Sequence, residues 1–192
     1  SGTTSNPKGV PLTYQNMIGN ARLSVPEFHM TSEDRNISAA PFSHLYGLYN
    51  FHVALCAGAL NILLPIFTPL DLAKEIEETK ATTVFLGPPH AASMINAGLL
   101  KKYNFSSVRF SMFSGSACPP HILKTYREQI STHGGETSIG QLWGMTETAG
   151  ATFCRDDGPK DLALKSAGFA APGNEIRVVS AKNGEVVLAN NE

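Results

Sequence analysis

The residues best suited to chemistry lie in one short run, Gln141-Leu142-Trp143-Gly144-Met145-Thr146-Glu147-Thr148. Gly144 lets the backbone approach a ligand closely because it carries no side chain. The Thr146 hydroxyl can donate a hydrogen bond to a phosphate oxygen, and the Glu147 carboxylate can hold a hard cation such as Mg²⁺. Trp143 offers a flat ring face to a heterocycle. The run predicts a turn where nucleotide, phosphate and metal meet, although a strand ending in a polar turn would look the same.

A second run, Ser1 to Val10, places four hydroxyl side chains, two glycines and one lysine within ten residues. Backbone N–H groups beside glycine, hydroxyls and an ammonium group together suit a polyphosphate. The run is not a Walker A loop, because Lys8 is followed by Gly9 rather than by Ser or Thr. A flexible linker is the alternative interpretation.

Strand-like and helical patterns alternate between these two runs. A helix capped by Thr13 is expected first, and the later helices are expected over 48–57, after Thr68-Pro69, after Pro88-Pro89 and after Pro119-Pro120. The expected strands are 37–40, 60–64, 82–86, 108–113 and 137–142. Short strands separated by helices predict an α/β fold with a doubly wound, mostly parallel sheet.

Polar or glycine-bearing turns follow four of the expected strands, at 42–47, 87–90, 114–118 and 144–148. In a parallel sheet these turns meet at one edge, where ligands of such folds bind. We therefore expect a single ligand site at the carboxyl edge of the sheet. Tyr46, Leu86, Phe113 and Leu142 are expected to shape the wall of its substrate pocket.

The composition changes after Gly150. Residues 155–161 are charged and loop-like, and 175–179 and 185–188 read as two strands of a hairpin joined through Asn183-Gly184. We expect an α/β nucleotide-binding subdomain over 1–150 and the incomplete start of a β-rich subdomain over 151–192.

The overall composition narrows the class of protein. The chain has 192 residues and a formal net charge of -1, so nothing indicates a nucleic-acid partner. Its longest apolar run, 51–67, is interrupted by polar residues and proline, which disfavours a transmembrane segment. The three cysteines form neither a disulfide framework nor a zinc motif, so we expect an intracellular location, in the cytoplasm or in an organelle such as the peroxisome.

Five segments, taken in chain order, carry motifs of one enzyme superfamily. They are a Ser/Thr/Gly-rich loop at 1–10, Pro-Phe-x-His-x-x-Gly at 41–47, a Ser-Gly-x-Ala turn at 114–117, Trp-Gly-x-Thr-Glu at 143–147, and Ala-Gly with Pro-Gly-Asn-Glu at 167–175. The sequence thereby resembles the adenylate-forming superfamily of acyl-CoA synthetases, 4-coumarate-CoA ligases, luciferases and nonribosomal peptide adenylation domains. The resemblance covers nearly the whole chain.

The resemblance implies ATP/AMP, Mg²⁺ and coenzyme A as cofactors, with Lys8, His44, Thr146 and Glu147 as the catalytic set and Glu147 as the metal ligand. His44 and Tyr46 would border the acyl pocket, and Trp143 would stack on adenine. The remaining nucleotide-binding residues it implies are Ser1, Gly2, Thr3, Thr4, Ser114, Gly115, Ser116, Ala117, Gln141, Leu142, Gly144 and Met145.

The chain departs from the family pattern at several positions. Trp143 replaces the usual tyrosine, Tyr14 replaces a histidine after the first loop, and Cys118 replaces a proline. The sequence starts without methionine and stops before the family's ribose-binding aspartate, hinge and C-terminal lysine. We therefore expect a partial adenylation domain that is inactive or impaired by itself.

The implied chemistry is attack of a carboxylate on the α-phosphorus of ATP, followed by transfer of the acyl group to coenzyme A. The acid would be of the fatty-acid or phenylpropanoid kind. Two alternatives stay open. One is a nucleotide-binding module without catalysis, and the other is a serine hydrolase using Ser116, although the Gly-x-Ser-x-Gly spacing is missing.

Overall fold

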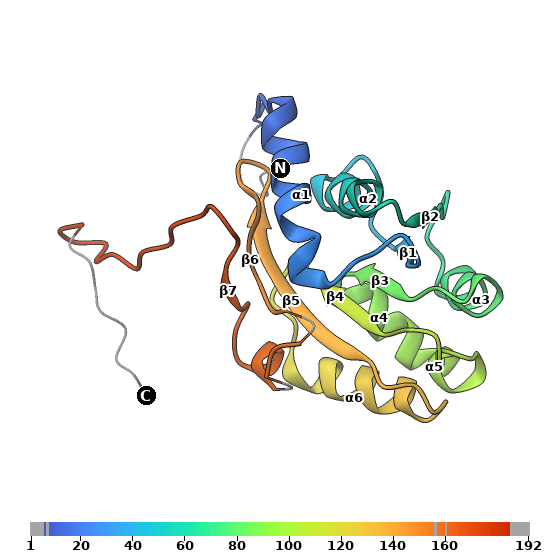
Figure 1. The fold of residues 1–192 in the computed structure, drawn as a ribbon. Coiled ribbons are helices and arrows are strands. Elements are labelled where there is room, and N and C mark those ends of the chain that lie inside the picture. Colours follow the sequence, from blue (N-terminus) through green and yellow to red (C-terminus); the bar gives the residue numbers. More distant parts are fainter. Residues whose placement is uncertain (1–5, 7, 156, 160, 185–192) are drawn as a thin grey trace.

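The alternating strands and helices form one twisted sheet with helices on both faces (Figure 1). The computed structural model describes residues 6, 8–155, 157–159 and 161–184. Its strands are β1 (Arg35–Ser38), β2 (Leu60–Ile62), β3 (Thr83–Leu86), β4 (Phe110–Phe113), β5 (Ser138–Met145), β6 (Ala149–Phe153) and β7 (Phe169–Ala170). Its α-helices are α1 (Asn20–Ser24), α2 (Leu45–Ala57), α3 (Pro69–Thr79), α4 (Pro88–Asn96), α5 (Leu99–Lys102) and α6 (Pro120–Ser131). Its other helical turns are the π-helix η1 (Gln15–Gly19) and the 3₁₀ turns η2 (Pro26–Phe28) and η3 (Leu162–Leu164).

The strand order is β2-β1-β3-β4-β5-β6-β7. The first five of these strands are parallel to one another, and β6 and β7 add antiparallel strands at one edge. The predicted α/β class with a mostly parallel sheet is thus confirmed. Leu86 lies opposite Phe113, and Phe113 lies opposite Gln141. The turns that follow β3 and β4 therefore leave the same edge of the sheet.

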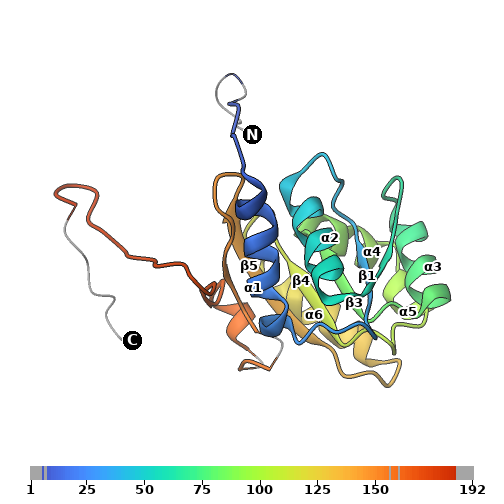
Figure 2. The ribbon, with the colours of Figure 1, turned by 45° about the horizontal axis from the view of Figure 1, so that its top comes forward.

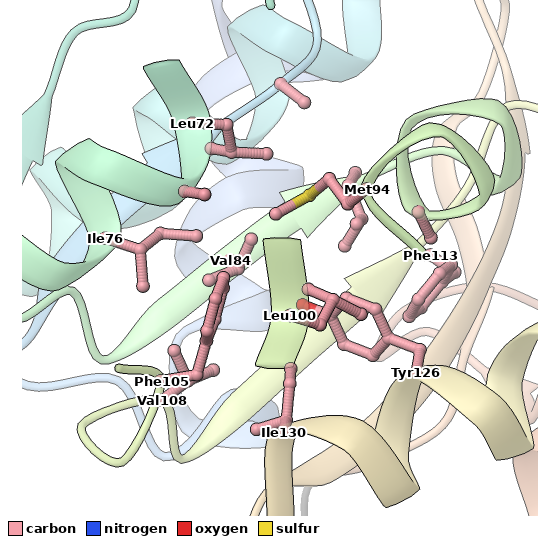
Figure 3. Close-up of a cluster of buried hydrophobic side chains, with 14 of the residues drawn as sticks. Leu72, Ile76, Val84, Met94, Leu100, Phe105, Val108, Phe113, Tyr126 and Ile130 are labelled. Atoms are coloured by element: carbon pink, nitrogen blue, oxygen red, sulfur yellow. The ribbon is translucent and has the colours of Figure 1, made fainter. Parts of the chain in front are cut away.

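Two hydrophobic cores cover the two faces of the sheet. On β3, Val84 and Leu86 join the core under α3 to α6, whereas Phe85 joins the core under α1 and α2. This alternation follows from the two-residue period of a strand. Figure 3 shows the first core, in which Met94 and Tyr126 approach strand side chains from the helices. Because both faces are buried, the strands read as continuous apolar runs rather than as alternating ones.

Side-chain caps fix where the helices near the site begin. The Thr68 hydroxyl accepts the N–H of Asp71, as the sequence predicts for α3. The His44 ring performs the same role for α2, because its Nδ1 accepts the N–H of Tyr46 over 3.1 Å. Helix α2 therefore begins at Leu45, three residues before the predicted start, since histidine is not a residue that normally signals an N-cap.

The structure differs from the expectations most clearly after β5. Strand β5 continues through Met145, and the chain turns back as β6, which was not predicted because glycine and alanine disfavour strands. Residues 175–178 form no strand, and the predicted partner at 185–188 lies outside the described residues. The last described residues, drawn in red, extend away from the sheet (Figures 1 and 2). Ile176 and Val178 are exposed there.

An ion pair ties the segment before β1 to the middle of the sheet. Arg109 donates to both carboxylate oxygens of Asp34, at 2.9 and 2.8 Å, and to the carbonyl of Phe28 at 3.2 Å. Burial alone would raise the pKa of Asp34. Hydrogen bonds from Arg109, Thr82 and the backbone of Thr31 outweigh it and hold the pKa below its ordinary value of 3.8.

We expect Arg109→Ala to lower the free energy of unfolding by about 2 kcal/mol at neutral pH, because it leaves the Asp34 carboxylate buried without its cation. A carboxyl group with a lowered pKa stabilises the fold above its unfolded-state pKa, and this stabilisation disappears as pH falls through the folded-state pKa. The difference between wild type and variant should therefore shrink below about pH 4. Urea unfolding at several pH values measures it. A difference that does not change with pH would contradict this role of Arg109.

Candidate active site

The predicted catalytic run forms the tip of a β-hairpin. Met145 pairs with Ala149, and the three residues between them, Thr146, Glu147 and Thr148, make the turn. The N–H of Thr148 donates to the carbonyl of Met145 over 3.1 Å and closes this turn. Thr146 is half-buried and Glu147 is exposed, so the carboxylate is available to a ligand.

Three backbone features allow this hairpin to close. A Cβ at Gly144 would lie 1.9 Å from the carbonyl oxygen of Ala149, so only glycine fits there. Ala149 itself has a φ of 54°, in the left-handed region that costs most residues energy. The pairing also shifts register between Trp143 and Gly144, which is a β-bulge. The tip is thus a strained and specific structure, of the kind that clusters at functional sites.

A cavity of about 370 Å³, here called the rim pocket, opens beside this tip at the carboxyl edge of the sheet. Three expected turns meet in it: the start of α2, the turn after β4 and the β5–β6 tip. Its lining includes nine of the predicted site residues, namely His44, Tyr46, Ser114, Gly115, Leu142, Gly144, Met145, Thr146 and Glu147. The structure therefore brings together segments that lie about a hundred residues apart in the sequence.

A second cavity of about 590 Å³, here called the flanking groove, shares Ser114, Gly115, Leu142 and Gly144 with the rim pocket. Ser116, Ala117, Gln141, Trp143 and residues 164–167 also line it. Trp143 is 48% exposed, so its ring is accessible to a ligand. Gly115 has a φ of 94°, and a Cβ there would meet no atom within 4 Å, so the backbone faces open space.

Gln141 contributes to the groove as a scaffold. Its Oε1 accepts the N–H of Cys118 over 3.3 Å, and its Nε2 donates to the carbonyl of Ala163. The side chain therefore holds the turn after β4 against η3. Cys118 is buried in the core, and burial raises the pKa of its thiol to about 11, so it stays protonated at neutral pH.

Two tyrosines of α2 form the wall of the rim pocket. The Tyr46 hydroxyl donates to the carbonyl of Met112 over 2.7 Å, which ties its side chain to strand β4. Tyr49 also lines the pocket, and its hydroxyl donates to Ser24 over 2.7 Å. Tyr49 was not predicted as a site residue. Its position three residues after Tyr46 puts both on one helix face, a signal that was available in the sequence.

Phe113 does not line the rim pocket, although the sequence predicts it in the wall of the substrate pocket. Its side chain is buried in the core under α3 to α6, and its ring packs edge-on against Tyr126 with the ring centroids 5.2 Å apart (Figure 3). The neighbouring residue Met112 points to the other face, in accord with the strand period. An unbroken apolar run gives no sign of which face each residue takes.

The first loop is described only in part. Ser1, Gly2, Thr3 and Thr4 lie outside the described residues, and Lys8 is exposed and not part of the rim-pocket lining. The segment after Lys8 nevertheless faces the hairpin tip. Leu12, Gln15 and Asn16 line a further cavity of about 370 Å³ together with Glu147 and Thr148. Figures 1 and 2 show the start of the first helical segment, in blue, beside the tip of the orange hairpin.

Among the described residues that line the rim pocket, Glu147 is the only one with a carboxylate. Within the described part of the chain, no three His, Cys, Asp or Glu side chains gather into a metal site. This donor set fits Mg²⁺, which commonly binds through one or two protein carboxylates while substrate phosphates and water supply the other ligands. It does not fit zinc, whose sites take three or four protein ligands.

In the ranges that the structure describes, no helix is both long and apolar enough to span a bilayer.

Comparison with known proteins gives a consistent result. The family model described as "AMP-binding enzyme" matches residues 1–192. The long-chain-fatty-acid–CoA ligase of Bacillus subtilis is 31% identical, over 96% of this chain and 32% of that protein. The 4-coumarate–CoA ligase-like 8 of Arabidopsis thaliana is 28% identical, over 99% of this chain and 34% of that protein. The chain thus spans about a third of the length of these curated relatives.

Solved structures share the fold as well as the sequence pattern. The crystal structure of ATP-bound MatB from Rhodopseudomonas palustris superposes with a TM-score of 0.85 at 25% identity. The superposition covers all of this chain and 36% of that one. Since the family model spans every residue and the fold agrees, the chain belongs to the AMP-binding enzyme family.

Proposed function

We propose that the protein containing this chain activates a carboxylic acid with ATP, forming an acyl-adenylate and releasing pyrophosphate, and then transfers the acyl group to coenzyme A. It would thus be an acid–thiol ligase. The observation that carries the proposal is the meeting of the hairpin tip, the turn after β4 and the start of α2 in the rim pocket. The acyl-CoA ligases among its relatives support the same chemistry.

The two cavities suggest how the substrates divide the site. A nucleotide base would lie in the flanking groove, against the exposed face of Trp143 and the open backbone of Gly115. The acid would enter the rim pocket beside Tyr46 and Leu142. The phosphate between them would lie near Thr146 and Glu147, at the point where the two cavities share Gly144.

The chain's own residues would then stabilise the charge that develops on phosphorus. Thr146 can donate its hydroxyl proton to an α-phosphate oxygen, and Lys8 can place an ammonium near the β- and γ-phosphates. Glu147 would hold Mg²⁺, which supplies positive charge that offsets the phosphate oxygens. No side-chain nucleophile is needed, because the carboxylate of the substrate attacks. Positioning and electrostatic stabilisation carry most of such phosphoryl chemistry.

Acid-dependent exchange of labelled pyrophosphate into ATP tests the proposal in the full-length protein. A panel of medium-chain, long-chain and phenylpropanoid acids should contain at least one that supports exchange, and thioester should form when coenzyme A is added. ATP binding without exchange for every acid would favour a non-catalytic nucleotide-binding module. Ester hydrolysis without ATP would favour the serine hydrolase, which is disfavoured because Ser116 lacks the strand-to-helix elbow spacing.

Residues 1–192 by themselves should form thioesters poorly. The curated relatives are about three times as long, so these residues carry only part of the proposed machinery. Thioester formation by this segment at the rate of the full-length protein would contradict that expectation.

Lys8→Ala should slow pyrophosphate exchange about 10- to 100-fold, because it removes one cation that offsets the phosphate charge. The KM for ATP should rise more than the KM for the acid. Steady-state exchange with each substrate varied in turn measures both constants. Lys124→Ala, which removes an exposed lysine of α6, serves as the control and should leave the exchange rate and both KM values unchanged. Equal rates in the Lys8 and Lys124 variants would remove Lys8 from the site.

A further inference from the structure

Asn20 makes two hydrogen bonds to a single backbone residue of the hairpin. Its Nδ2 donates to the carbonyl of Gly150 over 3.0 Å, and its Oδ1 accepts the N–H of Gly150 over 3.2 Å. A carboxamide carries a donor and an acceptor side by side, so it satisfies both polar groups of one residue. Gly150 is the register partner of Gly144, immediately behind the turn. These two hydrogen bonds between Asn20 and Gly150, here called the clamp, therefore hold the hairpin next to the residues proposed to contact phosphate and metal.

Further contacts hold both partners of this clamp in place. The Ser24 hydroxyl donates to the carbonyl of Asn20 over 2.9 Å and accepts the hydroxyl of Tyr49 over 2.7 Å. Gly150 packs directly on the Tyr49 ring, since a Cβ at residue 150 would lie 3.2 Å from it. Asn174 adds a longer hydrogen bond to the Gly150 carbonyl at 3.5 Å. The clamp thus joins α1, α2 and the hairpin into one unit.

Asn20 also has an unusual place in its helix. It directly follows the π-helical segment η1, a conformation that is rare and frequent at functional sites. That segment follows Lys8 by seven residues and shares a cavity with Glu147. The helix therefore connects the proposed phosphate loop with the tip of the hairpin.

We propose that Asn20 is a positioning residue, which fixes Thr146 and Glu147 relative to the segment carrying Lys8. Its effect on catalysis rests on the proposed function, whereas the clamp itself can be tested without it. A displacement of about 1 Å at a reacting centre can cost up to about 100-fold in rate. Loss of the clamp frees the hairpin to move by such an amount.

The test compares Asn20→Ala and Asn20→Asp with Asn61→Ala in the full-length protein. Asn61 is the matched control, because it is also half-buried and makes two side-chain hydrogen bonds, to Asn36 and to the Phe51 carbonyl, at the β2 edge. Asn20→Ala should lower kcat for pyrophosphate exchange about 10- to 100-fold, with a higher Mg²⁺ requirement and little change in the KM for the acid. Asn61→Ala should lower only the melting temperature.

Asn20→Asp adds a readout that a merely structural role would not produce. The carboxylate that this substitution introduces can, when ionised, accept the N–H of Gly150 but repels its carbonyl, whereas a protonated carboxyl group can both donate and accept. The rate relative to wild type should therefore rise as pH falls towards the pKa of that carboxyl group. A flat ratio, together with kinetic constants for Asn20→Ala that match Asn61→Ala, would overturn the proposal.

Hydrogen–deuterium exchange gives an answer that does not depend on activity. The amides of the hairpin, residues 145–151, should exchange faster in Asn20→Ala than in wild type and be unchanged in Asn61→Ala. Unchanged protection in Asn20→Ala would refute the clamp even if the enzyme is active. Absence of pyrophosphate exchange in the wild type would instead refute the proposed function, and the protection data would still decide whether the clamp exists.

Discussion

Glu147→Ala in the full-length protein should slow acid-dependent pyrophosphate exchange by about 100-fold or more, because it removes the rim-pocket carboxylate that we propose holds Mg²⁺. Glu147→Gln should be nearly as slow, since it keeps the shape of the side chain but loses its charge. Raising the Mg²⁺ concentration should recover part of the rate in both variants. Exchange rates measured over a Mg²⁺ titration check this expectation.

The control for Glu147 is Glu78→Ala, which removes an exposed carboxylate from α3, outside the rim-pocket lining. It should exchange at the wild-type rate at every Mg²⁺ concentration. Glu147 is exposed at the turn, so its replacement should leave the melting temperature within a few degrees of wild type. Wild-type exchange by folded Glu147→Ala at limiting Mg²⁺ would show that this carboxylate holds no metal.

Much of this arrangement could be predicted because local signals and the sheet topology agree. Thr68 with Pro69 predicts the start of α3, and the structure begins the helix there. Apolar runs of four to six residues between helices predict a parallel sheet, and parallel strands bring their following turns to one edge. The meeting of His44, Gly115 and Glu147 in one cavity follows from that topology rather than from any one motif.

The remaining features depend on tertiary contacts that no local pattern encodes. Strand β6 consists largely of small residues with weak strand preference, and β5 and β7 supply its ladder. The sequence does not predict which face of the sheet Phe113 points to, because both faces are buried and the strand is largely apolar. The clamp from Asn20 to Gly150 spans 130 positions, so neither residue alone indicates its partner.

The position of the hairpin explains why a strained turn is tolerated at this edge. Its two strands are held by β4 and β7 through ladder pairing, by Tyr49 through packing and by Asn20 through hydrogen bonds. Such support can maintain backbone conformations that cost energy by themselves. The exposed carboxylate of Glu147 then sits on a rigid element, which favours accurate placement of a bound cation.

Gly144→Ala should reduce pyrophosphate exchange by about 100-fold or more, because the new Cβ would lie 1.9 Å from the carbonyl oxygen of Ala149. The two strands must separate at the bulge to admit it, and the turn carrying Thr146 and Glu147 must move with them. Overpacking of this kind costs about 1–3 kcal/mol of stability. Exchange kinetics and urea unfolding of the same preparation measure both effects.

Gly98→Ala is the control that distinguishes the steric clash at position 144 from the general effect of replacing a glycine by alanine. Gly98 has a φ of 66° and open space around its Cα, so an alanine there strains the backbone without meeting another atom. It should cost about 1 kcal/mol of stability and leave exchange unchanged, because the turn between α4 and α5 lies outside the rim pocket. If Gly144→Ala is folded and exchanges pyrophosphate as fast as Gly98→Ala, the geometry of the hairpin tip does not control the reaction.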